Sequence, residues 1–201
     1  MLNALNETEI NPNPLKQFEK WYGDAISAGV PEADAMTLAT ATKDGSPDAR
    51  IVLLKSFDER GFVFYTNYRS RKADELGENE KACLLFYWLP VKRQVRIEGT
   101  VEKVSAQESD DYFQSRPWGS QLGAWASDQS EVIAGREDLE KRFHEFELKF
   151  AGNVPRPPHW AGYRVKPNAI EFWQGRENRL HDRIRYRAQE DGSWRIERLA
   201  P

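Results

Sequence analysis

The chain of 201 residues lacks several features that mark common protein classes. It contains a single cysteine, Cys83, which excludes a disulfide within the chain and a metal site built on cysteines. The N-terminus has no basic stretch followed by an apolar one, and no apolar run approaches the length of a membrane span. We therefore expect a cytoplasmic protein with no membrane partner.

The common catalytic signatures are also missing. The sequence has no G-x-G-x-x-G, no Walker loop, no H-E-x-x-H and no G-x-S-x-G. The three histidines, His144, His159 and His181, are far apart and have no metal-ligand spacing. The sequence therefore predicts no metal site and neither metal-dependent nor serine-dependent hydrolysis. If the protein is an enzyme, we expect a bound cofactor to supply the reactivity.

Aromatic and arginine residues are prominent among what the chain does contain. Seven Trp, seven Tyr and ten Phe either fill the core or cover a dimer interface or a flat aromatic ligand. The net charge is only -3, yet six arginines lie in the last 23 residues: Arg179, Arg183, Arg185, Arg187, Arg195 and Arg198. A local cluster in a chain of balanced charge indicates a discrete anion rather than a nucleic acid.

Hydrophobic spacing predicts a mainly β fold. Residues 1–13 are polar and read as a flexible arm, and residues 14–201 form a single domain. We expect helices over residues 15–28, 70–77, 105–115 and 137–150, the third opened by a capping box at Ser105 and Glu108. Residues 117–130 read as a structured loop. Strands are predicted over residues 36–42, 48–57, 62–66, 82–89, 94–104, 160–167, 169–174, 182–188 and 193–199. This order favours an antiparallel barrel with peripheral helices over a doubly wound sheet.

Two segments in the first half of the chain are suited to binding an anion. Ser70-Arg71-Lys72 opens a predicted helix, where a phosphate would satisfy the free N–H groups, the hydroxyl and both cations; the alternative is a solvated first turn. The apolar strand from Arg50 to Lys55 carries a cation at each end, although strand ends are often charged.

Two further segments suggest recognition of a phosphorylated ring. Tyr112 and Arg116 share one helix face, and Ser120 follows, which makes a phosphate clamp or simply a helix end complemented by Arg116. Between Glu171 and Arg183, the side chains of Trp173, Arg179 and His181 suit a planar phosphorylated heterocycle.

The stretch from Ile170 to Arg183 resembles the signature of the pyridoxine/pyridoxamine 5'-phosphate oxidases. It reads Ile-Glu-Phe-Trp-Gln, four residues, then Arg-Leu-His-Asp-Arg. Further similar segments follow the same order along the chain: 50–55, 65–66, 70–72, 115–117, 120–127, 129–130 and 198–201. The resemblance implies a split β-barrel of the FMN-binding type and a homodimer with FMN between the subunits.

The resemblance also implies an activity and a set of site residues. The reaction is oxidation of pyridoxine or pyridoxamine 5'-phosphate by O2 to pyridoxal 5'-phosphate and hydrogen peroxide, in vitamin B6 biosynthesis and salvage, with hydride passing from substrate C4' to N5 of FMN. The residues implied to bind FMN are Arg50, Ile51, Val52, Leu53, Leu54, Lys55, Tyr65, Thr66, Arg71, Lys72, Gln94, Gln129, Ser130, Trp173 and Arg183. Those implied to bind substrate are Lys55, Tyr112, Arg116, Ser120, Arg179, Leu180 and His181, of which Arg179 and His181 are the catalytic pair.

One departure from the family pattern concerns the N-terminal arm. Many relatives carry Arg and Tyr there, folded over the substrate, whereas residues 1–15 contain no Arg, Lys or Tyr. Two other functions stay open at this point. One is a related flavin oxidase that acts on a different ring, and the other is a non-catalytic module that binds flavin or pyridoxal phosphate.

Overall fold

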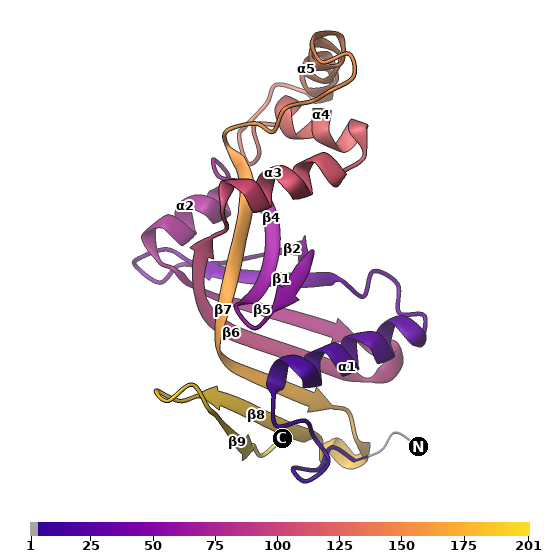
Figure 1. Cartoon of the computed structure of the whole chain (residues 1–201), viewed down its shortest axis with the longest axis vertical. Helices are drawn as coiled ribbons and strands as arrows, with labels where there is room; N and C mark the ends of the chain where they lie inside the picture. Colours follow the sequence, from indigo (N-terminus) through magenta and orange to yellow (C-terminus); the bar gives the residue numbers. More distant parts are fainter. Residues whose placement is uncertain (1–3) are drawn as a thin grey trace.

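Nine antiparallel strands form one strongly curled sheet in the computed structural model, which describes residues 4–201 (Figure 1). Its order is β2-β1-β5-β6-β7-β4-β3, and β8 and β9 extend it from the second half of β7. The strands are β1 Ala35–Ala41, β2 Pro47–Leu53, β3 Ser56–Asp58, β4 Gly61–Asn67, β5 Lys81–Trp88, β6 Arg93–Lys103, β7 Trp160–Gln174, β8 Asp182–Ala188 and β9 Trp194–Arg198. The predicted mainly β, antiparallel split-barrel fold is confirmed.

Five α-helices lie around the sheet. They are α1 Pro14–Ser27, α2 Arg71–Glu78, α3 Ala106–Ser115, α4 Trp118–Ala126 and α5 Arg136–Lys149. Helices α3 to α5 gather at one end of the long strand β7, and β8, β9 and the C-terminus lie at the other (Figure 1). The Ser105 hydroxyl accepts a hydrogen bond from Glu108 N at 3.1 Å, so the predicted cap opens α3. No helix among residues 4–201 is long and apolar enough to span a membrane.

Helix α1 closes the core with aromatic side chains. Phe18 is fully buried and its ring contacts the rings of Phe57, Phe62 and Phe86, with centroids 4.9–5.2 Å apart. The strands beneath supply alternating residues, as in β6, where Val95 and Ile97 are fully buried. Part of the aromatic content therefore belongs to the core.

A bulge lets β6 and β7 curl. Gly99 pairs with Pro167 and Glu98 with Ala169, so Asn168 has no partner on β6. A Cβ on Gly99 would lie 2.0 Å from Lys166 O, which only glycine avoids. The two strands predicted at 160–167 and 169–174 are therefore one continuous strand, because the bulge accommodates Pro167 within the ladder.

The structure corrects two other boundaries. Residues 117–130, predicted as a loop, contain α4, because Leu122 and Ala126 pack into the interior and this burial outweighs the poor helix propensity of Gly119 and Gly123. The strand predicted at 48–57 is interrupted after Leu53. There Leu54 N donates to Asp34 O and Lys55 N to Val63 O, so the chain passes from pairing with β1 to pairing with β4.

Residues 4–13 of the predicted flexible arm lie against the C-terminal strands. Leu5 and Ile10 are buried, Leu5 N donates to Asp182 Oδ2 at 3.2 Å, and the Tyr186 hydroxyl donates to Asn11 O at 2.7 Å. The first three residues of the arm lie outside the described residues. Leu5 thus lies next to Asp182, at the end of the segment that carries Arg179 and His181.

Candidate functional site

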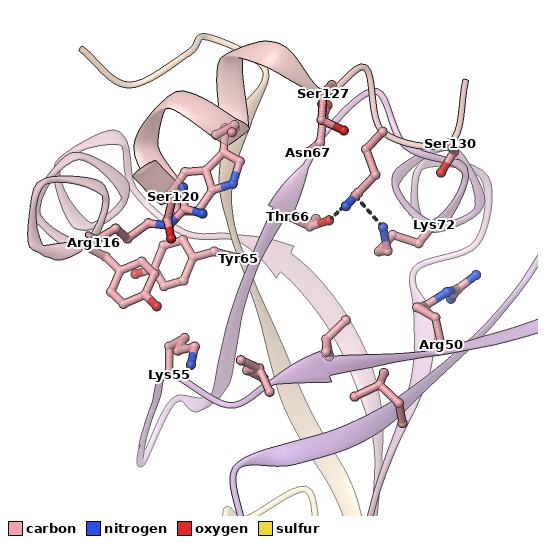
Figure 2. A pocket seen from close by; sticks show the side chains of 18 of the residues that line it. Arg50, Lys55, Tyr65, Thr66, Asn67, Lys72, Arg116, Ser120, Ser127 and Ser130 are labelled. Carbon is pink, nitrogen blue, oxygen red and sulfur yellow. Dashed lines mark hydrogen bonds between the residues drawn. The ribbon is translucent and has the colours of Figure 1, made fainter. Parts of the chain in front are cut away.

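A cavity of about 980 Å³ opens between the sheet and the helical end of the molecule (Figure 2). Its walls come from β2, β4, the start of α2, the end of α3, α4 and residues 127–130. Fourteen of the predicted site residues line it: Arg50, Ile51, Val52, Leu53, Lys55, Tyr65, Thr66, Arg71, Lys72, Tyr112, Arg116, Ser120, Gln129 and Ser130. Residues that lie as far apart in sequence as Arg50 and Ser130 therefore converge on one site.

One end of the cavity, which we call the Arg50 end, holds three cations from β2 and the start of α2. Lys72 Nζ donates to Gln129 Oε1 at 2.7 Å and to Ser70 Oγ at 3.0 Å, and Thr66 Oγ1 donates to the same Gln129 oxygen at 3.1 Å (Figure 2). Arg71 N lies 3.3 Å from Ser130 Oγ. The start of α2 and residues 129–130 are thereby joined into one polar wall.

Two carboxylates missed in the sequence analysis organise the arginines of this end. Glu75 is 3 % exposed, and its oxygens accept from Thr40 Oγ1 at 2.5 Å, Arg50 Nη2 at 2.9 Å and Arg71 Nε at 3.0 Å. Asp48 Oδ2 lies 2.7 Å from Arg50 Nη2 and 3.2 Å from Arg71 Nε. Burial raises the pKa of Glu75, but the hydrogen bonds from Thr40, Arg50 and Arg71 outweigh it and the pKa is lowered. The carboxylate is therefore ionised.

Lys72 is the most deeply buried cation at this end, with 8 % of its surface exposed. Burial, and then the neighbouring Arg50 charge, lower the pKa of its ammonium group to about 8. Because burial makes the charged form of Lys72 costly, an anion that binds beside it stabilises the protonated ammonium group.

The opposite end, which we call the Arg116 end, is built by α3, α4 and β4. The Arg116 guanidinium lies over the Trp160 ring, with Cζ 4.5 Å from the ring centroid, and its Nη1 is buried without a hydrogen-bond partner among the described residues. Burial lowers the pKa of Arg116. Ser120 and Lys55 lie on the same side of the cavity (Figure 2), and Lys55 Nζ is 3.1 Å from Asp34 Oδ2. The predicted clamp therefore has a buried donor with no acceptor among residues 4–201.

A stack of rings forms one wall of the Arg116 end. Tyr65 and Tyr112 stack with ring centroids 4.0 Å apart, and Tyr65 stacks on Trp160 at 5.3 Å. Burial, followed by the charge of Glu108, raises the pKa of Tyr65 to about 12, so its hydroxyl stays protonated near neutral pH. The three rings present a flat apolar surface beside the Arg116 guanidinium.

The remaining predicted residues lie outside this cavity. Gln94, Trp173 and Arg183 are neighbours across β6, β7 and β8, and the Trp173 ring lies 4.7 Å from the His181 ring. Arg183 Nε donates to Glu171 Oε1 at 2.8 Å. We call the predicted site residues in this region the Trp173 cluster: Gln94, Trp173, Arg179, Leu180, His181 and Arg183. Leu54 belongs to neither set and is buried in the core.

The backbone around the predicted catalytic pair has an unusual conformation. Asn178 and Arg179 both have positive φ, 54° and 61°, in a short 3₁₀ turn. Such residues cost energy and are enriched at functional sites. Arg176 N donates a hydrogen bond to His181 Nδ1 at 3.1 Å. Because Nδ1 is the acceptor, the neutral form of this imidazole carries its proton on Nε2.

Several cavity residues were missed in the sequence analysis. Asn67, Ser127 and Trp160 line the cavity, and Asn67 Nδ2 donates to Ser127 O at 3.3 Å. The spacing of Arg71 and Glu75, four residues apart on a predicted helix, was a usable signal for one ion pair. Nothing local marked Trp160, whose role depends on the tertiary contact with α3.

Fold and cavity together define a split-barrel protein with a cation-lined cleft. Residues 22–150 match the family model described as pyridoxamine 5'-phosphate oxidase, and residues 160–201 match the one described as the pyridoxine 5'-phosphate oxidase C-terminal dimerisation region. The chain belongs to the pyridoxine/pyridoxamine 5'-phosphate oxidase family. The second match supports a homodimer.

Curated relatives agree with this assignment, and two solved structures have a similar fold. The chain is 57% identical to the pyridoxine/pyridoxamine 5'-phosphate oxidase of Cupriavidus necator and 59% identical to that of Trichormus variabilis, in each case over the whole chain and 95% and 94% of the relative. The crystal structure of PhzG from Burkholderia lata, in complex with tetrahydrophenazine-1-carboxylic acid, is 33% identical with a TM-score of 0.93, covering 99% of this chain and 98% of that one. A related FMN-binding protein from Nostoc punctiforme shares the fold, at 18% identity and a TM-score of 0.74, over 92% of this chain and 97% of that one.

Proposed function

We propose that this protein is an FMN-dependent oxidase that converts pyridoxine 5'-phosphate or pyridoxamine 5'-phosphate to pyridoxal 5'-phosphate, with O2 as electron acceptor. The observation that carries the proposal is the presence of two separate cationic ends in one cavity of about 980 Å³. A cavity of this size accommodates two aromatic ligands in contact. FMN and a B6 phosphate ester each carry one phosphate, so two anion sites are what the reaction requires.

The Arg50 end fits the phosphate of FMN. Arg50, Arg71 and Lys72 supply three cations, and the positive end of the α2 helix dipole adds to them. Gln129 and Ser130 stand beside them, where the hydroxyls of a ribityl chain need polar partners. When bound, FMN supplies the redox chemistry by accepting two electrons from the substrate and passing them to O2.

The Arg116 end fits the substrate phosphate. Its buried Nη1 has no acceptor within the described chain, and a phosphate oxygen would supply one. Lys55, Ser120 and the Tyr112 hydroxyl add a second cation and two hydroxyl groups around the same space. A phosphate held here would orient the substrate ring toward the centre of the cavity.

We assign the Trp173 cluster to the second subunit's cavity. Its members lie outside the cavity of their own chain, and all of them except Gln94 belong to the region matched as a dimerisation region. In this arrangement FMN lies at the subunit interface, and Gln94, Trp173 and Arg183 line the flavin from the partner's side.

Arg179 and His181 are proposed to act on the substrate ring rather than on FMN. Arg179 polarises the C4' oxygen or nitrogen, and the proton on His181 Nε2 provides a donor that helps to orient that atom. The main contribution of the protein is orientation of two rings and neutralisation of two phosphates.

Oxygen consumption by the purified protein tests the function directly. Protein loaded with FMN should consume O2 and release hydrogen peroxide with either phosphate ester, and should turn over unphosphorylated pyridoxine far more slowly. Equal rates with pyridoxine and its 5'-phosphate would contradict the assignment of the Arg116 end. Such a result would favour an oxidase for another ring, as the likeness to PhzG suggests. Binding of FMN without peroxide release would instead indicate a non-catalytic module.

A further inference from the structure

Glu75 stands out because a buried carboxylate lies at a site that must bind a phosphate. It is 3 % exposed and comes from the second turn of α2, whose first residues line the Arg50 end. A negative charge near a phosphate weakens phosphate binding, so we expect a carboxylate at this position to contribute in another way. The contacts of Glu75 indicate what that contribution is.

The two oxygens of Glu75 are used separately. Oε2 accepts from Arg50 Nη2 at 2.9 Å and from Thr40 Oγ1 at 2.5 Å, and Oε1 accepts from Arg71 Nε at 3.0 Å. Arg50 comes from β2 and Arg71 from α2, so one carboxylate fixes two guanidinium groups that reach the cavity from different elements. Thr40, on β1, holds the carboxylate in turn.

Without Glu75, the three cations of the Arg50 end would have fewer carboxylates to balance their charge. Arg50, Arg71 and Lys72 would face one another with only Asp48 to separate the arginines. The Arg71 side chain is 67 % exposed, and once its Glu75 contact is lost, the contact of Nε with Asp48 Oδ2 at 3.2 Å is left to restrain it. Arginines that are held less firmly would lose more side-chain entropy on meeting a phosphate, whereas arginines fixed by Glu75 have already lost it.

We propose that Glu75 is a positioning residue for phosphate recognition, which holds Arg50 and Arg71 in the geometry that selects a phosphorylated flavin over riboflavin. The inference rests on the proposed function, because it assigns the Arg50 end to FMN. Glu75 does not touch the ligand; it acts through the two guanidinium groups.

The test compares the affinities of the protein for FMN and for riboflavin, which lacks the phosphate. For Glu75→Gln we expect FMN affinity to fall about 10-fold or more while riboflavin affinity stays within about twofold, because a side-chain amide has one acceptor oxygen and cannot hold both guanidinium groups. Quenching of flavin fluorescence measures both constants. A merely structural role would weaken both ligands together and leave their ratio unchanged.

Glu78→Gln is the matched control. Glu78 is an exposed glutamate at the end of the same helix, and it accepts from Lys43 N at 3.3 Å, away from the cavity lining. The ratio of the two affinities should stay at the wild-type value. Glu75→Asp serves if Glu75→Gln does not fold, since it keeps the buried charge but is too short to reach both arginines. We expect the same selective loss from it.

A double-mutant cycle with Arg71→Met checks the route of the effect. If Glu75 acts through Arg71, Glu75→Gln should cost less FMN affinity in the Arg71→Met background than in the wild type. Tighter FMN binding by Glu75→Gln would overturn the inference, because Glu75 would then be only a repelling charge. Wild-type protein that binds riboflavin as well as FMN would instead overturn the proposed Arg50 end itself.

Discussion

Arg198 binds Glu7 across 191 residues of sequence, with its Nε and Nη2 each 2.7 Å from one carboxylate oxygen. The same guanidinium donates to Leu5 O at 2.7 Å and to Asp182 Oδ1 at 3.0 Å. Asp182 directly follows His181. Leu5 and Glu7 of the N-terminal arm are therefore fixed by this guanidinium beside the proposed catalytic pair.

Acid should release the arm before it unfolds the barrel. The hydrogen bond from Arg198 lowers the pKa of Glu7 from 4.5 to about 2. A carboxylate whose pKa is lowered on docking stabilises the docked state fully above pH 4.5, and this contribution is lost as the pH falls from about 4.5 to about 2. Hydrogen exchange at Leu5 N, corrected for intrinsic rates, should accelerate over that range. Glu7→Gln should show fast exchange already at pH 7, and Glu9→Gln should behave as the wild type.

Removing the charge of Arg116 should weaken substrate binding without lowering the stability of the protein. Arg116→Met keeps an apolar side chain against Trp160 and removes a buried cation whose Nη1 has no hydrogen-bond partner in the described part of the chain. We expect the flavin-free protein to keep its free energy of unfolding or gain about 1 kcal/mol. The KM for pyridoxine 5'-phosphate should rise about 10- to 100-fold, as expected for a lost charged hydrogen bond. Denaturant unfolding and steady-state kinetics measure the two effects, and a large loss of stability with unchanged KM would contradict this reading.

Strands such as β1 and β6 were predictable because their side chains alternate. The cations were predictable because helix starts and strand ends are recognisable in sequence. Helix α4 was not, since Gly119 and Gly123 are poor helix formers and only the burial of Leu122 against α3 explains the helix. Glu75 was hidden for a similar reason. In the sequence it belongs to a polar helical segment, and only the approach of β1 and β2 buries it.

Residue spacing alone could not reveal that the predicted site divides in two; only the family resemblance implied FMN between the subunits. Arg50 and Arg116 line one cavity, whereas His181 and Trp173 lie outside it. Spacing along a chain carries no information about which copy of a homodimer completes a site. The C-terminal match to a dimerisation region supplies that link for the proposal.

The FMN affinity should fall with rising pH because of Lys72. Burial lowers the pKa of Lys72 to about 8, so the FMN-free protein loses this cation above that pH, while a phosphate monoester stays doubly charged above its second pKa of about 6. We expect affinity to be constant from pH 7 to about 8 and then to fall by up to about tenfold per pH unit, with uptake of one proton on binding. Fluorescence titrations in buffers of different ionisation enthalpy measure both. Lys72→Met should bind FMN more weakly at pH 7 and show a flat profile over this range.

Arg179→Ala should uncouple flavin binding from turnover. Arg179 lies outside the cavity that is proposed to hold the FMN phosphate, and its φ of 61° marks a turn that alanine tolerates no better than arginine does. The variant should therefore stay yellow, with FMN affinity within a few-fold of the wild type, while kcat falls about 100-fold because the substrate's C4' substituent loses its polarising partner. Arg136→Ala on the exposed face of α5 is a control of the same chemical type, and it should leave kcat unchanged. A colourless Arg179→Ala protein would mean that Arg179 holds the flavin rather than the substrate.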